Sequence, residues 1–208
     1  MNFYIADTHF GHKNILRFDN RPFGDMEQME EVMVMLWNAS VRKGDHVYIL
    51  GDFCWQKSDE WLRLVKQLNG QKTLILGNHD LSSFPAELKN QFADITPYKE
   101  IVDNGRDNSH RKVIMSHFPI PFYRHANDEK FFMLCGHVHA TAENDLLEKW
   151  TKELRDGYRE GFAAHTANAG QIYNVGCMLP WMGYTPRTLD EIIKRWDKYH
   201  PEGAVWKP

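Results

Sequence analysis

Five short apolar segments of this chain each end in a cluster of Asp, Asn or His residues. Apolar runs of this length indicate buried β-strands. In open α/β sheets, ligand-binding residues lie at the carboxyl ends of the strands, so we expect the five clusters to converge at one edge of a sheet. In chain order, the clusters are Asp7-Thr8-His9, Gly51-Asp52, Gly77-Asn78-His79-Asp80, His117 and Gly136-His137-Val138-His139.

The spacing of apolar residues predicts an α/β chain. The early strands alternate with helices, which favours parallel βαβ units, and the later strands follow one another more closely, as antiparallel pairs do. We expect strands at residues 3–6, 47–50, 73–76, 95–102, 111–115, 131–134 and 172–175. We expect helices at residues 26–41 with Asp25 as the N-cap, from a cap at Ser58, at 85–92, within 140–170, and at 188–199 with Thr188 as the cap.

No internal repeat, low-complexity segment or linker divides the sequence, so we expect one domain over residues 1–208. The stretch at residues 140–170 is a helical insertion between the last cluster and the last strand. We consider it a lid over the site or a contact between subunits. The alternative is a helix that packs on its own domain.

The composition is that of a soluble globular protein, with 42% hydrophobic and 25% charged residues. A net charge of -3 does not indicate a large surface for nucleic acid, although a local basic groove stays open. Cys54, Cys135 and Cys177 form no CxxC pair, which argues against a disulfide framework and a thiolate zinc site. Without a long apolar run or a secretory signal, we expect a cytoplasmic protein that does not bind membranes.

The residue types in the clusters point to transition-metal chemistry. Imidazole and carboxylate ligands together suit Mn, Fe, Zn, Co or Ni. Asp7 and His9 are two residues apart, which places both side chains on the same face of an extended chain, and the same holds for His137 and His139. A single Asp-x-His is more often a capping Asp beside a partly buried His, so the prediction depends on all five clusters occurring together.

The order Asp-x-His, Gly-Asp, Gly-Asn-His-Asp, His and Gly-His-x-His resembles the signature of the calcineurin-like metallophosphoesterase superfamily. The motifs span Asp7 to His139, about two-thirds of the chain, and none is missing. The resemblance implies the metallo-dependent phosphatase fold, in which two β-sheets pack as a sandwich flanked by helices, in four layers ordered α/β/β/α. It places the metals at the strand ends.

The same resemblance implies a centre of two divalent transition-metal ions, with Mn as the first choice and Fe, Zn, Ni or Co as alternatives. It implies that His79 contacts the substrate phosphate and protonates the leaving oxygen, and that Asp80 orients His79. The implied ligands are Asp7, His9 and His139 for one ion, Asn78, His117 and His137 for the other, and Asp52 as a bridge between the two.

This ligand set suits an anionic substrate. Two divalent ions bring four positive charges and Asp7 and Asp52 return two negative ones, so the pocket stays positive and attracts phosphate. Two such ions also lower the pKa of a bridging water, which supplies a hydroxide nucleophile near neutral pH. No Ser or Cys nucleophile is then required.

Residues next to the clusters are candidates for substrate contacts. We predict that His12, Arg17 and Arg124 bind the substrate, and we consider Arg21 on the same ground. A surface role is the alternative for each arginine, and capping of the next helix is the alternative for His12. Phe118, Phe122 and Tyr123 follow His117 closely, and they form either an apolar wall for the leaving group or part of the core or rim.

The function that these inferences favour is hydrolysis of phosphate esters. A monoester, a diester, a pyrophosphate or a nucleic acid is compatible with the ligands. The absence of a basic run favours a small or nucleotide-type substrate, with long nucleic acid not excluded, and a homodimer is the assembly we consider. The alternative is a catalytically silent protein-interaction scaffold of the same fold. Scaffolds of that kind typically lose the His of the Asn-His-Asp motif, and this chain retains it as His79.

Overall fold

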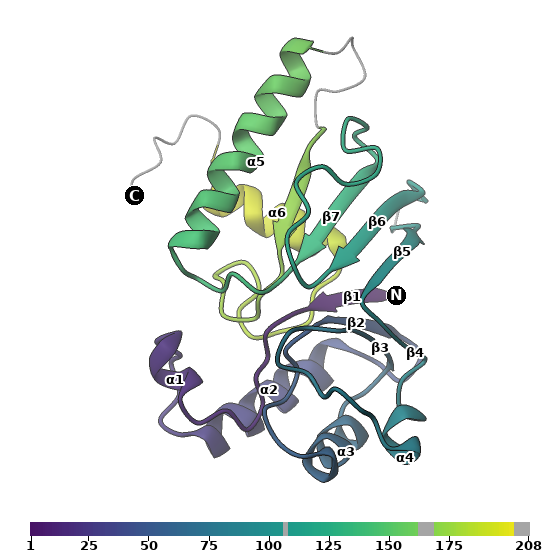
Figure 1. Cartoon of the computed structure of the whole chain (residues 1–208), viewed down its shortest axis with the longest axis vertical. Helices are drawn as coiled ribbons and strands as arrows, with labels where there is room; N and C mark the ends of the chain where they lie inside the picture. Colours follow the sequence, from purple (N-terminus) through teal and green to yellow (C-terminus); the bar gives the residue numbers. More distant parts are fainter. Residues whose placement is uncertain (106–107, 162–168, 202–208) are drawn as a thin grey trace.

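The computed structural model describes residues 1–105, 108–161 and 169–201, and these residues form two four-stranded sheets (Figure 1). The first sheet is parallel throughout, and in the second the first two strands pair antiparallel and the rest parallel. The strand order in the first sheet is β1 (Asn2–Ile5), β2 (His46–Leu50), β3 (Gln71–Ile75) and β4 (Asp94–Thr96). The order in the second is β5 (Tyr98–Asp103), β6 (Arg111–Ser116), β7 (Phe131–Cys135) and β8 (Gln171–Asn174).

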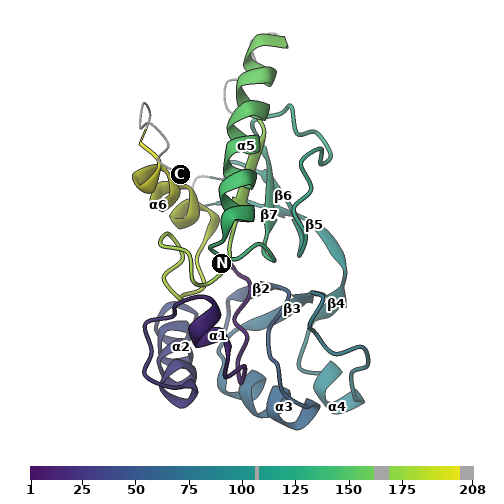
Figure 2. The same cartoon turned by 60° about the vertical axis from the view of Figure 1, so that its left-hand side comes forward.

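Helices flank both sheets (Figures 1 and 2). Two of the predicted caps are confirmed. The Asp25 side chain accepts a hydrogen bond from the backbone N–H of Gln28, and Thr188 forms a capping box with Glu191. The helices are α1 (Ile15–Phe18), α2 (Met26–Ser40), α3 (Ser58–Gln67), α4 (Ala86–Lys89), α5 (Ala142–Gly161) and α6 (Leu189–Tyr199).

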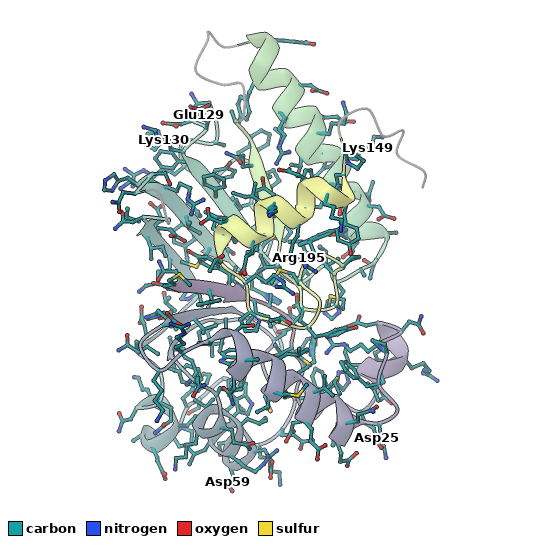
Figure 3. All side chains as sticks on the ribbon, turned by 180° about the vertical axis from the view of Figure 1, so that it is seen from behind. Asp25, Asp59, Glu129, Lys130, Lys149 and Arg195 are labelled. Atoms are coloured by element: carbon teal, nitrogen blue, oxygen red, sulfur yellow. The ribbon has the colours of Figure 1, made fainter. Side chains whose placement is uncertain are left out.

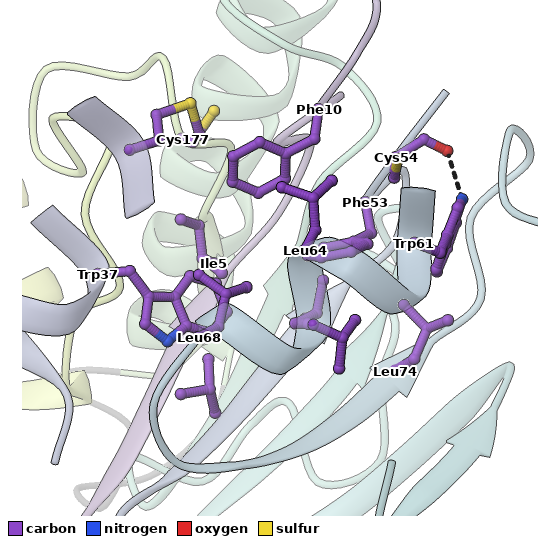
Figure 4. Packing of buried hydrophobic residues seen from close by; sticks show 14 of the residues in the cluster. Ile5, Phe10, Trp37, Phe53, Cys54, Trp61, Leu64, Leu68, Leu74 and Cys177 are labelled. Atoms are coloured by element: carbon purple, nitrogen blue, oxygen red, sulfur yellow. Dashed lines mark hydrogen bonds between the residues drawn. The ribbon is translucent and has the colours of Figure 1, made fainter. Parts of the chain in front are cut away.

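The strands of the first sheet bury both faces because their residues alternate between two cores. Phe3 and Ile5 of β1 pack with α2 and α3, whereas Tyr4 and Ala6 point toward the second sheet. Figure 4 shows the core on the helical side, where Trp61 also donates its indole N–H to the carbonyl of Cys54.

The second sheet repeats this pattern. Phe132 and Leu134 of β7 face the core between the sheets, and Met133 and Cys135 face the helix α5. The layers therefore run helices, sheet, sheet, helix, which confirms the predicted four-layer α/β/β/α sandwich. Helix α6 contributes Leu189 to the central core, and from behind it is seen between α5 and the first sheet (Figure 3).

Several predicted elements were wrong in detail. The strand expected at residues 95–102 is two strands in different sheets, because Pro97 between them has no N–H to continue a ladder. The later strands are antiparallel only at β5 and β6. The β6–β7 and β7–β8 pairs are parallel, and the connections between these strands are long enough for crossovers. Helix α3 begins at Ser58 with Lys57 as its N-cap, and the helix expected at 85–92 is the shorter α4.

The predicted insertion at residues 140–170 contains α5, and residues 162–168 lie outside the described part of the chain. The inner side of α5 packs on the second sheet through Leu147 and Leu154. Leu146 and Trp150 of the same helix are exposed. These contacts agree with the alternative prediction, a helix that packs on its own domain.

Candidate metal centre

Four of the predicted ligands form a compact group at the ends of the central strands. Asp7, His9, Asp52 and His139 each offer a ligand atom, and these atoms all lie within 4.8 Å of one another. Asp7 and Asp52 are almost fully buried. Parallel β1 and β2 bring Asp7 and Asp52 side by side, since the two strands end at the same edge.

The other three predicted ligands form a second group. The amide oxygen of Asn78 lies 2.9 Å from His117 Nε2 and 3.0 Å from His137 Nδ1. Asp52 joins the two groups, because its Oδ2 lies 3.6 Å from His9 Nε2 and also 3.6 Å from His117 Nε2. The structure therefore brings all seven predicted ligands together, in two groups that share one carboxylate.

The second group has the chemistry of a cation site. The Nδ1 of His117 lies 2.8 Å from the carbonyl oxygen of Leu50, which only accepts hydrogen bonds, so Nδ1 carries the proton. Burial lowers the pKa of His117 and keeps the ring neutral, which leaves a lone pair on Nε2. That lone pair faces the Asn78 oxygen, another acceptor. A cation held by this nitrogen and this oxygen together would satisfy both lone pairs.

The first group also has the chemistry of a cation site. Asp19 accepts a hydrogen bond from His139 Nδ1 at 2.7 Å, so the Nε2 of His139 points into the group and lies 3.2 Å from His9 Nε2. Burial lowers the pKa of His9 to about 2, so this ring stays neutral, which is the form that binds metals. Two imidazole nitrogens and two carboxylates therefore converge here, and this donor set suits a first-row divalent ion.

Asp7 is a buried carboxylate with a raised pKa. Burial, together with the nearby Asp52 carboxylate, raises its pKa to about 7, although His139 and Arg21 act against this rise. The backbone N–H of His137 donates to both Asp7 oxygens at 3.1 Å, which offsets part of the cost. A bound divalent ion would stabilise the ionised form.

Five of the seven ligands adopt left-handed backbone conformations, which are uncommon outside glycine. Strained positions of this kind gather at functional sites. The side chains thus reach the site through turns in the backbone, and the expectation of an extended chain at each Asp-x-His or His-x-His pair was wrong. The five residues and their φ angles are Asp7 (55°), His9 (48°), Asp52 (52°), His137 (73°) and His139 (47°).

A glycine allows the ends of β2 and β3 to meet at the shared carboxylate. A Cβ on Gly77 would lie 2.3 Å from the Asp52 Oδ1 atom and 2.6 Å from the Asp52 backbone nitrogen. Contacts that short do not occur for real side chains. The Gly-Asn-His-Asp motif therefore needs its glycine because the backbone of Asp52 passes directly over it.

The Asp80 carboxylate is hydrogen-bonded to the backbone near Asp52. Its carboxylate accepts hydrogen bonds from the backbone N–H groups of Asp52, Phe53 and Gly77, and among the described residues it has no hydrogen bond to the His79 ring. Asp80 thereby fixes the backbone around Asp52, and the orientation of His79 by Asp80 stays a prediction. His79 is held by its own backbone N–H, which donates to Asp52 Oδ1 at 2.9 Å.

An exposed tryptophan that sequence reasoning missed lies beside the first group. Trp55 stacks on the His12 ring, with 4.2 Å between centroids and 15° between planes. The His79 ring lies 4.6 Å from Trp55, and the His12 ring lies 5.7 Å from His9. The structure thus places His12 and His79 next to the first group. No motif marked Trp55, which only follows the Gly-Asp cluster by three residues.

The three arginines differ in position. Arg124 is exposed and pairs with Glu100 at 3.2 Å. Arg17 is exposed and lies 5.6 Å from the ring of its neighbour Phe18. Arg21 is buried.

Arg21 and Asp19 form a buried pair behind the first group. Arg21 donates to the carbonyl oxygens of Asp7 and Thr8, each at 2.8 Å, and pairs with Asp19 at 2.8 Å. Asp19 in turn holds His139. Asp19 was missed because it follows no apolar strand. Its carboxyl group, which can hold a histidine ligand in place, is the only feature by which the sequence marks Asp19.

Among the helices of the described residues, none has the length and apolar content required for a membrane span.

Comparison with known proteins agrees with this geometry. The model of the calcineurin-like phosphoesterase family matches residues 3–169. An uncharacterized protein of Methanocaldococcus jannaschii is 42% identical over 38% of this chain and 46% of its own length. The gene 66 protein of Mycobacterium phage L5 is 32% identical over 37% of this chain and 38% of its own length. The chain thus spans less than half of each of these two relatives.

A protein of unknown function from Aquifex aeolicus has a similar crystal structure, with a TM-score of 0.57 and 26% identity over 93% of this chain and 98% of that one. The family match covers every predicted ligand, from Asp7 to His139. Fold, ligand geometry and family model therefore lead to the same conclusion, that this chain belongs to the calcineurin-like phosphoesterase family.

Proposed function

We propose that the chain is a dinuclear metal-dependent hydrolase of phosphate esters. The observation that carries the proposal is the division of seven ligands into two groups that share Asp52. Each group presents nitrogen and oxygen lone pairs to a common point, as a cation site does. Membership of the phosphoesterase family supports the same reaction class.

The residues present fit two first-row divalent ions, with Mn as our first choice. Asp7, His9 and His139 would hold one ion and Asn78, His117 and His137 the other, with Asp52 shared. When bound, the ions supply the positive charge that attracts a phosphate and the acidity that ionises a water.

Hydrolysis forms a bond between a water oxygen and phosphorus and breaks the bond between phosphorus and the leaving oxygen. The leaving oxygen then takes a proton, and the other product carries the water oxygen. We assign the proton donation to His79, whose ring is exposed beside the first group while its backbone is anchored on Asp52. General acid catalysis by a placed histidine contributes about 10²–10⁴-fold.

The substrate that we propose is a small or nucleotide-type phosphate ester. The chain has a net charge of -3 and no basic run, which argues against a broad surface for long nucleic acid. A silent scaffold of the same fold is the competing reading. The retention of His79 beside a full ligand set favours the enzyme.

The experiment is reconstitution of the metal-free protein with manganese, followed by metal counting and assays with p-nitrophenyl phosphate and bis(p-nitrophenyl) phosphate. The proposal expects two ions per chain and turnover of at least one ester. The Asp52→Asn variant should lose turnover. Two bound ions without turnover of either ester would favour the scaffold.

A further inference from the structure

Two exposed aromatic rings lie at opposite ends of the candidate metal centre. Trp55 borders the first ligand group and Phe118 borders the second. Trp55 is 45% exposed and Phe118 is 49% exposed. Leaving an apolar ring in water forgoes the free energy of burying it, so an exposed ring beside a polar centre is a candidate contact for a ligand.

Trp55 is held in a fixed orientation next to the proposed proton donor. The His12 ring stacks on one face of the indole, 15° from parallel. The His79 ring lies 4.6 Å from the indole at an angle of 52°. The leaving group of the ester, which takes a proton from His79, would therefore lie next to Trp55.

Phe118 occupies the corresponding place beside the second group. Its ring lies 4.5 Å from His137 and 5.2 Å from His117, in both cases edge to face. Of the three aromatic residues that follow the His117 ligand, Tyr123 is buried in the core beside α5. Phe122 is 79% exposed, and Phe118 contacts both histidines.

Resting on the phosphoesterase function proposed above, we propose that Trp55 and Phe118 bind the two ester groups of an aromatic or nucleoside phosphodiester. Trp55 stacks on the leaving group, because it lies beside His79. Phe118 stacks on the group that stays on phosphorus, because it lies at the other end of the centre.

Two aromatic rings at the centre favour one class of substrate, the diesters with two planar groups. A phosphomonoester carries one organic group and leaves one ring without a partner, whereas a diester with two planar groups covers both rings. Stacking of a base on an aromatic side chain typically changes affinity by roughly tenfold or more. The chain should therefore prefer diesters with two planar groups over diesters with one.

Two substrates with the same leaving group test the role of Phe118. Bis(p-nitrophenyl) phosphate and methyl p-nitrophenyl phosphate both release p-nitrophenol, and they differ only in the group that stays. We expect kcat/KM to favour the bis-aryl ester in the manganese-loaded protein. Phe118→Ala should lower this preference roughly tenfold, whereas Phe118→Tyr should keep it.

The role of Trp55 is tested through KM. Trp55→Ala should raise KM for both diesters roughly tenfold, because both carry the aryl leaving group, and Trp55→Phe should restore most of the loss. Inorganic phosphate has no ring, so its inhibition constant should not change in any of these variants. Tyr199→Ala removes a ring of similar exposure, 51%, at the end of α6 and should leave all constants unchanged.

An unchanged preference in Phe118→Ala would overturn the assignment of Phe118. An equal rise in KM and in the inhibition constant of phosphate in Trp55→Ala would overturn the assignment of Trp55, since the change would then lie in the centre itself. If the unmutated protein binds two metals and hydrolyses neither the diesters nor p-nitrophenyl phosphate, the proposed function fails. If it hydrolyses only p-nitrophenyl phosphate, the function stands and the two-ring inference fails. If it hydrolyses both diesters at equal rates, the function stands and the two-ring inference fails.

Discussion

The Nδ1 of His139 lies 2.7 Å from a carboxylate oxygen of Asp19, and this bond directs the Nε2 of His139 toward the first ligand group. Asp19 is itself held by the buried Arg21. A carboxylate behind a histidine ligand fixes the tautomer and raises the basicity of the ring. The hydrogen bond from His139 to Asp19 therefore fixes the orientation of a ligand in the first group, which the other ligands of that group do not do.

Removal of Asp19 should therefore weaken metal binding. We expect Asp19→Ala to lower affinity for manganese by about 10–100-fold, and Asp19→Asn to lower it less because its amide oxygen still accepts from His139. Calorimetric titration of the metal-free protein measures this. Asp59→Ala, an exposed carboxylate in the first turn of α3, is the matched control. Unchanged affinity in Asp19→Ala would refute the role of Asp19.

A second prediction concerns the glycine beneath Asp52. Gly77→Ala places a Cβ 2.3 Å from an Asp52 oxygen, so the shared carboxylate must move. We expect loss of at least one bound metal and a fall of about 1–3 kcal/mol in unfolding free energy. Gly44→Ala is the control, since nothing lies within 4 Å of its Cβ. Metal counting and urea unfolding check both variants, and two metals retained in Gly77→Ala would contradict the prediction.

The pKa of Asp7 predicts how the metal-free protein responds to pH. Burial raises that pKa to about 7, so the folded state favours protonated Asp7. Its contribution to stability is full below the unfolded pKa of about 4 and is lost as pH rises through about 7. Asp7→Asn has no such charge, so without metal it should become more stable than the unmutated protein as pH rises, by at most about 4 kcal/mol.

Urea unfolding with a chelator at pH 4 and pH 8 measures this difference. The difference in unfolding free energy should be small at pH 4, and at pH 8 Asp7→Asn should be the more stable protein. Saturating manganese should reverse the order at pH 8, because only the unmutated protein retains the carboxylate ligand. A difference that is independent of pH would show that Asp7 titrates normally in the folded protein.

A fourth prediction separates catalysis from metal binding. His79→Asn should keep both metals, because the anchor of this residue is its backbone N–H on Asp52. It should lower kcat about 10²–10⁴-fold for an ester with a poor leaving group. For p-nitrophenyl esters the loss should be smaller, since nitrophenolate leaves with little need of a proton. Equal losses for both kinds of ester would argue against proton donation.

Much of the fold followed from the sequence because apolar strands that end in polar clusters carry a strong pattern. The seven ligands were found for the same reason, and the strand ends do bring them together. The backbone at these ends was not foreseeable from that pattern. The φ of Asp7 is 55° and that of His139 is 47°, and these turns depend on tertiary contacts such as the one between the Asp7 carboxylate and the N–H of His137.

The misses share a physical cause, which is dependence on long-range packing. Asp19 and Trp55 stand in loops, where no periodicity marks them, and only the fold brings them to the site. The three backbone partners of the Asp80 carboxylate were also missed, because the close passage of two strand ends supplies them. Pro97 is a local signal that does explain the sheet change between β4 and β5.

We propose that two metal ions joined by Asp52 hydrolyse a phosphate ester. The most direct measurement is the rate of bis(p-nitrophenyl) phosphate hydrolysis by metal-free protein as manganese is added in known equivalents, with bound metal counted at each step. We expect the rate to follow the doubly loaded protein and to reach its plateau at two ions per chain. A full rate at one ion per chain, or no turnover of this diester and of p-nitrophenyl phosphate with two ions bound, would refute the dinuclear mechanism.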